Sequence, residues 1–374
     1  MEPLAIDKNL SLDVSRPGVR TQKLGFIAQL DSFRFFAVFL VIVSHWLPDL
    51  FVNKVPNGYL GVTFFFVLSG YLISSNLLLA KKAVMDGRLA GGAALGNFYA
   101  RRFLRIFPLY YFTLFLIWAL NKNIYEHNFL WYILYGSNIL FYVQRHWQES
   151  LSHFWSLAVE EQFYLVWPML MLMVPSRLLK PCLIIVVASS ICYKLLTMVV
   201  FPTPFGDILT FAALDSFGLG ALLAYMQIFK KNFRLLDFGN IRWAFILIIV
   251  AFVLAIIGQR LLLYFTWPYF STLLIAKAYT GYRGFVGYLL NNRILRYFGK
   301  ISYGIYVYHN FIPWFFRCLR GTETQYPISL VPLLKDWHPS TIILLVTQFC
   351  FLIGVTSISW FCLEKPINEL KRYF

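Results

Sequence analysis

Charged residues are scarce in this sequence of 374 residues. Asp, Glu, Lys and Arg make up 13% of the chain, whereas hydrophobic residues make up 59% and aromatic residues 19%. Soluble domains carry about 25% charged residues. The chain therefore has too little polar surface to coat a water-soluble globule of its size, and its composition predicts a protein embedded in lipid.

Cysteine motifs are also missing, and we expect no cleavable signal peptide. The five cysteines lie in or beside apolar segments and none belongs to a Cys-x-x-Cys pair, which argues against a disulfide framework and against a metal site. Residues 1–25 are polar and basic, without an early apolar core, so we interpret them as a short cytoplasmic tail. We find no fixed-period repeat or low-complexity linker, and residues 1–374 are predicted to form a single domain.

The net charge of +16 would suggest nucleic acid as the partner of a soluble protein. In a lipid-embedded chain, basic residues instead mark cytoplasmic loops and face anionic headgroups, so we predict a bilayer and no nucleic acid as partner. The apolar segments are continuous rather than alternating, which favours helices over a barrel. They fall at about 30–50, 59–80, 106–120, 129–144, 151–174, 181–201, 207–229, 242–258, 262–282, 301–317 and 340–362.

The distribution of basic loops sets the predicted topology. All of the basic stretches can lie on the cytoplasmic side only if one of the segments 106–120 and 129–144 fails to cross. The second is short and contains Gly136, Ser137 and Asn138, so we interpret it as re-entrant or interfacial. The sequence thus predicts an all-α polytopic bundle of about ten transmembrane helices with both termini in the cytoplasm.

Two ionisable residues lie in the first apolar segment. Arg34 and His45 are eleven residues apart, so on a helix they share one face and are separated by a rise of ~16 Å. Burying such groups in lipid is costly unless they are paired with another polar group or hydrated. Ionisable residues inside a membrane segment are therefore functional candidates by default. The alternative is an arginine that reaches the interface and a hydrogen-bonded structural histidine. Asp31 could pair with Arg34 or cap the helix.

Basic and small residues suggest two further features. Arg101, Arg102 and Arg105 directly precede an apolar segment, which predicts a helix N-terminus with an anion site; the alternative is a positive-inside anchor. Ser69 and Gly70 are more typical of close helix packing than of chemistry, although a ligand tail could use the same close approach.

The adjacent carboxylates Glu160 and Glu161 lie in an apolar segment and point about 100° apart on a helix. A carboxylate near a buried histidine fixes the tautomer of the imidazole and raises its basicity. Weaker candidates are Asp215, interpreted as a packed polar contact, Lys194 and Lys277, and the face formed by Ser302, Tyr306 and His309.

Taken in order, these residues resemble the signatures of the acyltransferase 3 family of membrane O-acyltransferases, which modify bacterial surface glycans and some small natural products. The resemblance covers nearly the whole chain. The matching motifs are Arg34-x10-His45, Phe65-Phe66-x-x-Ser69-Gly70, Arg102-x-x-Arg105, Glu160-x-x-Phe163-Tyr164, Ser302-Tyr303-x-x-Tyr306-x-x-His309 and Glu364-Lys365-Pro366. The chain departs from the family at Ser32, where glycine is usual. Some relatives carry a C-terminal hydrolase-like domain, which we do not expect in this chain.

The resemblance implies an acyl-CoA donor, usually acetyl-CoA, a hydroxyl acceptor such as a surface glycan or lipid-linked saccharide, and a place in the bacterial inner membrane. His45 would be the general base, and Glu160 would orient it or neighbouring polar groups. Arg34, Arg101, Arg102, Arg105 and Ser69 would bind the donor, and no metal is expected. We expect direct transfer, with acceptor specificity set by outer loops such as 318–339.

Two other functions remain open from the sequence. A proton-coupled transporter or flippase also uses embedded Arg, His and Glu residues, but we find no inverted repeat and no pair of broken helices of the kind that such carriers show. An acyl-group carrier would pass the acyl group across the membrane to a separate transferase.

Overall fold

The computed structural model describes residues 10–13, 21–49, 54–121, 124–125, 127–229, 238–320 and 339–374. Several features predicted from the sequence lie outside the described residues: most of the basic tail, residues 230–237 of a basic loop, and residues 321–338 of the loop expected to select the acceptor.

Secondary structure in the described ranges is helical apart from one hairpin. Strand β1 (Leu10–Asp13) pairs antiparallel with β2 (Thr21–Leu24), with Leu10 opposite Leu24. The all-α prediction is confirmed for the helical bundle, and this hairpin is a feature that the sequence did not predict. The sequence of β1, Leu-Ser-Leu-Asp, alternates with the period of two that is typical of a strand, but four residues are too few for a reliable pattern.

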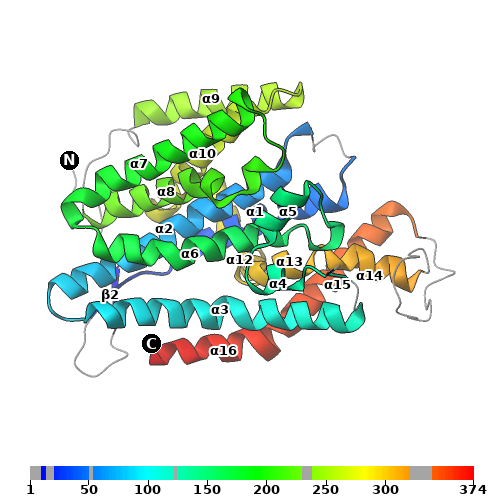
Figure 1. Cartoon of the computed structure of the whole chain (residues 1–374), viewed down its shortest axis with the longest axis horizontal. Helices are drawn as coiled ribbons and strands as arrows, with labels where there is room; N and C mark the ends of the chain where they lie inside the picture. The colour runs from blue at the N-terminus through cyan, green and yellow to red at the C-terminus, as the bar shows by residue number, and fades with distance from the viewer. Residues whose placement is uncertain are drawn as a thin grey trace. The chain divides into compact units, whose positions relative to one another are not determined.

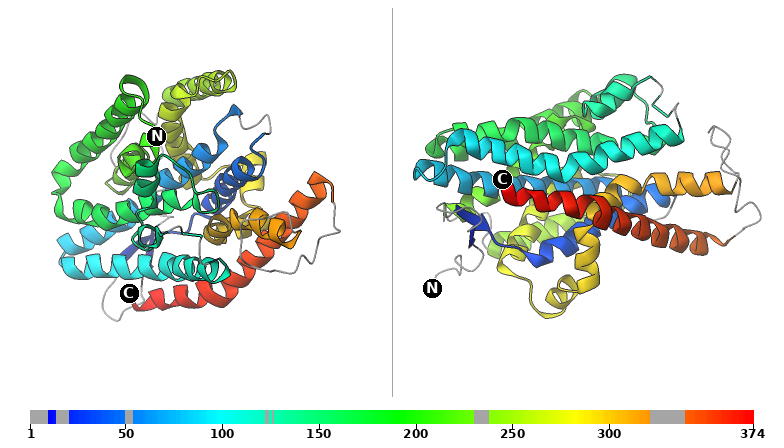
Figure 2. Two further views of the ribbon diagram at one scale, coloured as in Figure 1. Left: turned by 45° about the vertical axis from the view of Figure 1, so that its right-hand side comes forward. Right: turned by 90° about the horizontal axis from the view of Figure 1, so that it is seen from below.

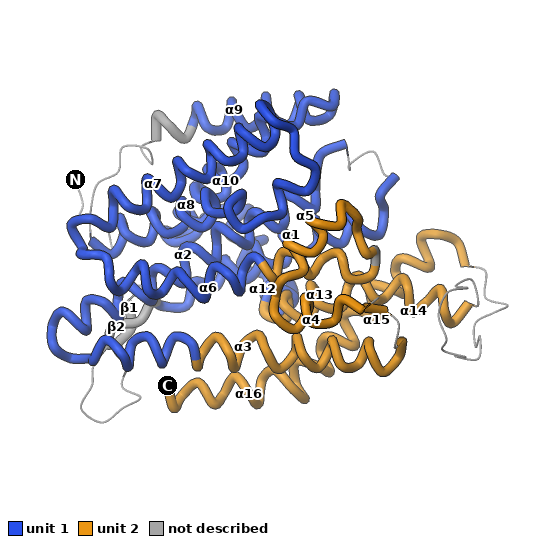
Figure 3. Tube along the Cα trace, in the orientation of Figure 1, with its two compact units in different colours: residues 1–99, 159–299 blue, residues 100–158, 300–374 orange. Residues whose placement is uncertain are grey.

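The chain divides into two compact units, each built from two separate stretches (Figure 3). Unit 1 consists of Met1–Tyr99 and Val159–Gly299, and unit 2 of Ala100–Ala158 and Lys300–Phe374. The boundaries between the units fall within helices α3 (Gly91–Leu120), α6 (Phe154–Met173) and α12 (Arg293–Lys300).

Unit 1 is built around helix α2 (Figure 1). Helix α2 packs against α1, α8 and α10, while α7 packs on α8 and α9 on α10. The helices of this unit are α1 (Ala28–Trp46), α2 (Asn57–Met85), most of α6 (Phe154–Met173), α7 (Ser176–Leu195), α8 (Thr210–Ile228), α9 (Phe238–Ile256), α10 (Leu261–Thr280), α11 (Gly284–Leu290) and α12 (Arg293–Lys300).

Glycines let α2 and α8 approach each other closely. A Cβ atom on Gly70 would lie 2.1 Å from the carbonyl oxygen of Phe217, and one on Gly220 would lie 2.1 Å from that of Val67. No side chain fits at these distances, because both neighbouring atoms belong to the backbone. The sequence-based interpretation of Gly70 as a packing residue is therefore confirmed.

Unit 2 contains most of α3 (Gly91–Leu120) and the short helices at the end of the chain. Tyr110 and Tyr111 on α3 donate hydrogen bonds to the carbonyls of Tyr132 and Ile133, at 2.7 and 2.9 Å. The remaining helices are α4 (Phe129–Ile133), α5 (Ser137–Gln144), α13 (Ser302–Tyr308), α14 (Phe311–Leu319), α15 (Thr341–Ser359) and α16 (Lys365–Glu369). Single turns complete the chain: η3 (Glu149–Leu151), η4 (Leu196–Val200), η5 (Gly206–Ile208), η7 (Trp360–Glu364) and η8 (Leu370–Tyr373).

Six helices among the described residues are long and apolar enough to cross a membrane. They cover Ala28–Trp46, Asn57–Met85, Gly91–Leu120, Ser176–Val200, Thr210–Ile228 and Thr341–Tyr373. Segment 129–144 is broken into two helices of 5 and 8 residues, too short to span singly. The predicted span 301–317 is likewise broken, at His309 and Asn310, into helices of 7 and 9 residues.

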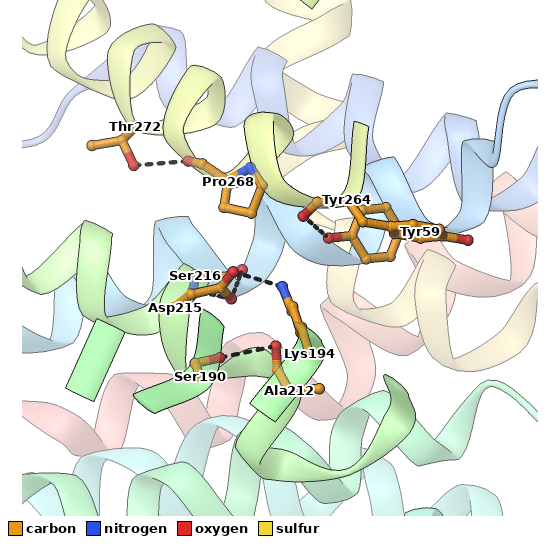
Figure 4. A network of polar contacts seen from close by, with 9 residues as sticks. All are labelled: Tyr59, Ser190, Lys194, Ala212, Asp215, Ser216, Tyr264, Pro268 and Thr272. Atoms are coloured by element: carbon orange, nitrogen blue, oxygen red, sulfur yellow. Dashed lines mark hydrogen bonds and ion pairs between the residues drawn. The ribbon is translucent and has the colours of Figure 1, made fainter. Parts of the chain in front are cut away.

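A buried ion pair joins α7 to α8 in unit 1 (Figure 4). The Nζ atom of Lys194 lies 2.6 Å from Oδ2 of Asp215, and the two residues are only 4% and 2% exposed. The other carboxylate oxygen of Asp215 accepts from the backbone N–H of Ser216 at 2.7 Å and from its hydroxyl at 3.1 Å. Asp215 is thus the packed polar contact that the sequence suggests, with Lys194 as its partner.

The same region ties α2 to α10. The Tyr59 hydroxyl donates to the carbonyl of Tyr264 at 2.8 Å (Figure 4), and the Trp267 indole N–H donates to the carbonyl of Leu60 at 2.9 Å. On α10, the Thr272 hydroxyl donates to the carbonyl of Pro268 at 2.9 Å. Side chains here satisfy backbone carbonyls inside the bundle, where water is scarce.

We predict that replacing one partner of the Lys194–Asp215 pair lowers the stability of the fold more than replacing both partners. Lys194→Met leaves a buried carboxylate without its cation and should lower the free energy of unfolding by ~3–5 kcal/mol, whereas Lys194→Met with Asp215→Asn should recover most of that loss. Thermal unfolding of the purified protein in detergent measures both. Lys180→Met removes an exposed lysine of the same helix and is the control. A double variant as unstable as the sum of its single variants would contradict the prediction.

Candidate active site

Helix α1 in unit 1 carries both Arg34 and His45, as the sequence predicts. Arg34 Nη1 donates to Asp31 Oδ1 at 2.5 Å, and Asp31 is only 6% exposed. Asp31 therefore pairs with Arg34 and does not cap the helix, whose N-cap residue is Ile27. This pairing balances the arginine charge and fixes one edge of the guanidinium group.

The start of α1 is anchored within unit 1. The hydroxyl of Ser32, the residue that replaces the family glycine, donates to the carbonyl of Leu290 at 2.7 Å. The Gln29 side-chain amide exchanges two hydrogen bonds with the backbone of Tyr282, at 3.1 and 2.8 Å. A Cβ on Gly299 would lie 1.7 Å from the carbonyl oxygen of Asp31, so α12 also approaches α1 closely. These contacts hold the helix that presents Arg34 and His45.

The hydrogen bond of His45 defines its tautomer. Nδ1 of His45 lies 3.0 Å from the carbonyl oxygen of Val41, one turn earlier on α1. A carbonyl can only accept, so Nδ1 carries the proton, and in the neutral ring Nε2 holds the basic lone pair. The His45 side chain is exposed on the molecule. This arrangement suits a group that accepts a proton at Nε2.

Glu160 reaches across from α6 to Ser69 on α2, also within unit 1. The Ser69 hydroxyl donates to Glu160 Oε1 at 2.5 Å, and the Tyr164 hydroxyl donates to the Ser69 oxygen at 3.2 Å. Ser69 and Glu160 are half-buried, whereas Tyr164 is 4% exposed. The three side chains form a polar network. Ser69 lies 91 residues from Glu160 and 95 residues from Tyr164 in sequence, and Glu160 and Tyr164 are one helical turn apart on α6.

Neighbouring aromatic residues hold α6 in place. The Phe163 ring stacks on that of Phe217, with centroids 3.9 Å apart and an interplanar angle of 8°. The Trp167 indole N–H donates to the hydroxyl of Ser74 at 2.8 Å. These contacts, on either side of Tyr164, fix the position of the Glu160 carboxylate relative to Ser69. The contact between Ser69 and a carboxylate is not visible in the sequence.

The three arginines lie on α3, in unit 2. The prediction that they mark a helix N-terminus is wrong, because α3 begins at Gly91, ten residues before Arg101. Residues 91–105 mix alanine and arginine with glycine and continue the helix without an apolar run, so hydropathy alone misses its first turns. Free backbone N–H groups therefore do not contribute here, and any anion must be bound by the side chains. Arg105 is exposed, and Arg101 and Arg102 are half-buried.

Glu364, from the terminal motif, interacts electrostatically with Arg105 in unit 2. Glu364 is 4% exposed, and its carboxylate accepts from the Ser359 hydroxyl at 3.4 Å. Ser359 in turn accepts from the Tyr308 hydroxyl at 3.3 Å. The motif thus contributes a buried carboxyl group that is held by Ser359 and lies within electrostatic range of Arg105.

A second polar cluster in unit 2 contains two buried histidines. His309 Nδ1 lies 2.6 Å from the carbonyl of Tyr306, and His153 Nε2 lies 3.1 Å from the carbonyl of Val307. The Tyr306 hydroxyl also contacts Ser156 and the carbonyl of His153. Sequence analysis missed His153, which lies seven residues before Glu160. Both histidines are at most 1% exposed and bond to the backbone, in agreement with a structural role for this aromatic segment.

Within the described ranges, no group of three or more His, Cys, Asp or Glu side chains is arranged to hold a metal ion.

Comparison with known proteins identifies the class to which this chain belongs. A family model described as an acyltransferase domain matches residues 27–364, and the chain is therefore a member of that acyltransferase family. No solved structure shows a significant match.

Among its relatives is YrhL of Bacillus subtilis, named as a candidate peptidoglycan O-acetyltransferase, which is 29% identical over 93% of this chain and 56% of its own length. The O-acetyltransferase OatA of Staphylococcus aureus is 28% identical over 76% of this chain and 50% of its own length. The peptidoglycan O-acetyltransferase OatA of Listeria monocytogenes is 32% identical over 39% of this chain and 24% of its own length. This chain spans about half the length of the first two relatives.

Proposed function

We propose that this protein is an O-acyltransferase of the bacterial inner membrane that transfers an acyl group, acetyl by default, from acyl-CoA to a hydroxyl of a surface glycan. The observation that carries the proposal is the hydrogen bond of His45. In this member of the acyltransferase family, a helix long and apolar enough to cross a membrane carries a histidine whose Nδ1 lies against the Val41 carbonyl, which supports Nε2 as the nitrogen that accepts a proton. The names of the relatives support a glycan acceptor. The family model covers both units, which supports their acting as a single domain.

The topology that we propose has ten spans with both termini in the cytoplasm. It rests on the placement of basic loops on the cytoplasmic side, and the six long apolar helices account for part of it. With this topology acyl-CoA enters from the cytoplasm, and the acceptor approaches from the outer side.

His45 acts as the general base in the proposed reaction. Its Nε2 accepts the proton of the acceptor hydroxyl while the hydroxyl oxygen attacks the thioester carbonyl. The carbon–sulfur bond then breaks, the CoA thiolate leaves, and the thiolate takes up the proton from the imidazolium. Imidazole suits this task because its usual pKa is close to neutral.

Glu160 positions Ser69 in this proposal and does not activate it as a nucleophile. The Ser69 proton points at the carboxylate and its oxygen accepts from Tyr164, so the hydroxyl is held from both sides. Carboxylates are normally weak bases, poorly matched to an alcohol of high pKa. We therefore keep direct transfer, with Ser69 lining the path of the donor tail.

The donor phosphates would be bound by arginines. Arg102 and Arg105 are three residues apart on α3 and present planar guanidinium groups that fit phosphate oxygens in pairs, with Arg101 adjacent. Arg34 remains a candidate for donor binding by its sequence motif alone.

We predict that His45→Ala lowers kcat for acyl transfer by ~10²–10⁴-fold and changes the KM for acetyl-CoA little, because general-base help is lost but donor binding is not. Release of free thiol and acetylation of a soluble peptidoglycan fragment are measured together on purified protein. His146→Ala, which alters an exposed histidine outside the helices, is the control. Near-normal acetylation by His45→Ala would remove the histidine from the mechanism.

The same assay separates the alternatives. A proton-coupled transporter or flippase consumes no thioester. An acyl carrier consumes the donor but leaves the acceptor unmodified.

We also predict that Glu160 and Ser69 act as one unit. Glu160→Gln and Ser69→Ala should each reduce kcat/KM, and the double variant should lose little beyond the worse single one, with a coupling energy of ~0.5–3 kcal/mol. Tyr164→Phe removes one hydrogen bond to Ser69 and should have a smaller effect. Steady-state kinetics of the four variants measures the coupling. Strictly additive losses would show that the hydrogen bond between Ser69 and Glu160 has no part in transfer.

A further inference from the structure

The last residues of the chain bring basic groups to α3 within unit 2. Helix α16 and the following turn η8 lie beside the unit 2 part of α3 in every view (Figures 1 and 2). Lys371, in η8, interacts electrostatically with Arg101, Arg102 and Arg105. Two segments far apart in sequence therefore bring a lysine and three arginines within electrostatic range of one another.

The position of Lys371 is fixed rather than free in solvent. Its side chain is half-buried, and Nζ donates to the side-chain oxygen of Asn368. The Asn368 amide donates in turn to the carbonyl of Glu364 at 2.8 Å, one turn back. This chain of hydrogen bonds ties the ammonium group to the segment that also supplies the Glu364 carboxylate.

Four like charges held together repel one another, and the repulsion is strongest where water is partly excluded. The Glu364 carboxyl group interacts electrostatically with Arg105 and offsets part of this positive charge. Such an arrangement is stabilised when it binds an anion, and a ligand with several phosphates matches it better than one with a single phosphate. Guanidinium groups bind phosphate oxygens in pairs, and an ammonium group adds a compact point charge.

We propose that Lys371 is the fourth cation of the donor site and binds a phosphate of acyl-CoA together with Arg101, Arg102 and Arg105. This inference rests on the proposed function, because it assumes an acyl-CoA donor. The shared chemistry is recognition of a phosphate group, which a lipid headgroup could also provide, and the experiment separates these two sources.

The test uses the full chain purified in neutral detergent and the variant Lys371→Gln. Calorimetric titration with CoA should show affinity reduced by ~10-fold or more, the usual worth of a charge-assisted hydrogen bond. The KM for acetyl-CoA should rise to a similar extent while kcat changes little. With acetyl-pantetheine, which has no phosphate, the variant and the native protein should behave alike. Lys371→Arg should retain most of the affinity.

Arg372→Gln is the matched control, since it removes one positive charge from the adjacent position. The Arg372 guanidinium is exposed, lies 4.9 Å over the Tyr373 ring and donates to its hydroxyl at 2.9 Å. Its loss should leave the affinity for CoA unchanged. If Lys371→Gln fails to fold, amine-reactive labelling of the native protein answers the same question, because bound CoA should protect Lys371.

The outcomes distinguish this inference from the proposed function. If the native protein binds CoA and Lys371→Gln does not change the affinity, the inference is overturned and the proposed function stands. If Lys371→Gln weakens binding to phosphatidylglycerol vesicles but not to CoA, the lysine binds lipid headgroups and the inference is also overturned. Native protein that neither binds CoA nor consumes acetyl-CoA would overturn both.

Discussion

Pairing of polar groups in a lipid-embedded bundle is the constraint on which the rest of this structure depends. A charge buried away from water is tolerated only with a partner, and the chain supplies partners from distant segments. Lys194 pairs with Asp215, Arg34 with Asp31, and Ser69 with Glu160. Each pair joins helices or fixes a side chain on one helix, so the polar residues hold the bundle together as well as forming its candidate site.

The same constraint separates structural residues from those suited to chemistry. The histidines His153 and His309 are at most 1% exposed and each lies against a backbone carbonyl, an environment typical of structural histidines. His45 bonds to its own helix through Nδ1, and its side chain is exposed. A histidine whose tautomer is fixed by one turn of helix can exchange a proton at the other nitrogen without disturbing the fold, and this is the property that a general base needs.

Sequence analysis predicted the long helices well because continuous apolar runs define them directly. The first segment was expected at about 30–50 and forms α1 (Ala28–Trp46), and that expected at 207–229 forms α8 (Thr210–Ile228). The predicted helix bounds were wrong where the length of a helix does not follow the hydropathy of its sequence. α3 begins at Gly91 because a mixture of glycine, alanine and arginine without an apolar run extends it, and His309 and Asn310 interrupt an otherwise apolar stretch. Individual site residues can be predicted because ionisable side chains are costly to bury in lipid. The contact between Ser69 and Glu160 depends on how α2 and α6 pack, and no local sequence pattern records that packing.

The central claim is that His45 presents Nε2 as the proton acceptor, and the protonation of its two ring nitrogens tests this most directly. Nitrogen NMR of the full chain in lipid, with labelled histidine and His45→Gln to assign the signal, reports which nitrogen carries the proton. The account predicts that neutral His45 is protonated at Nδ1 and unprotonated at Nε2, because Val41 accepts from Nδ1. A neutral His45 protonated at Nε2 would contradict it.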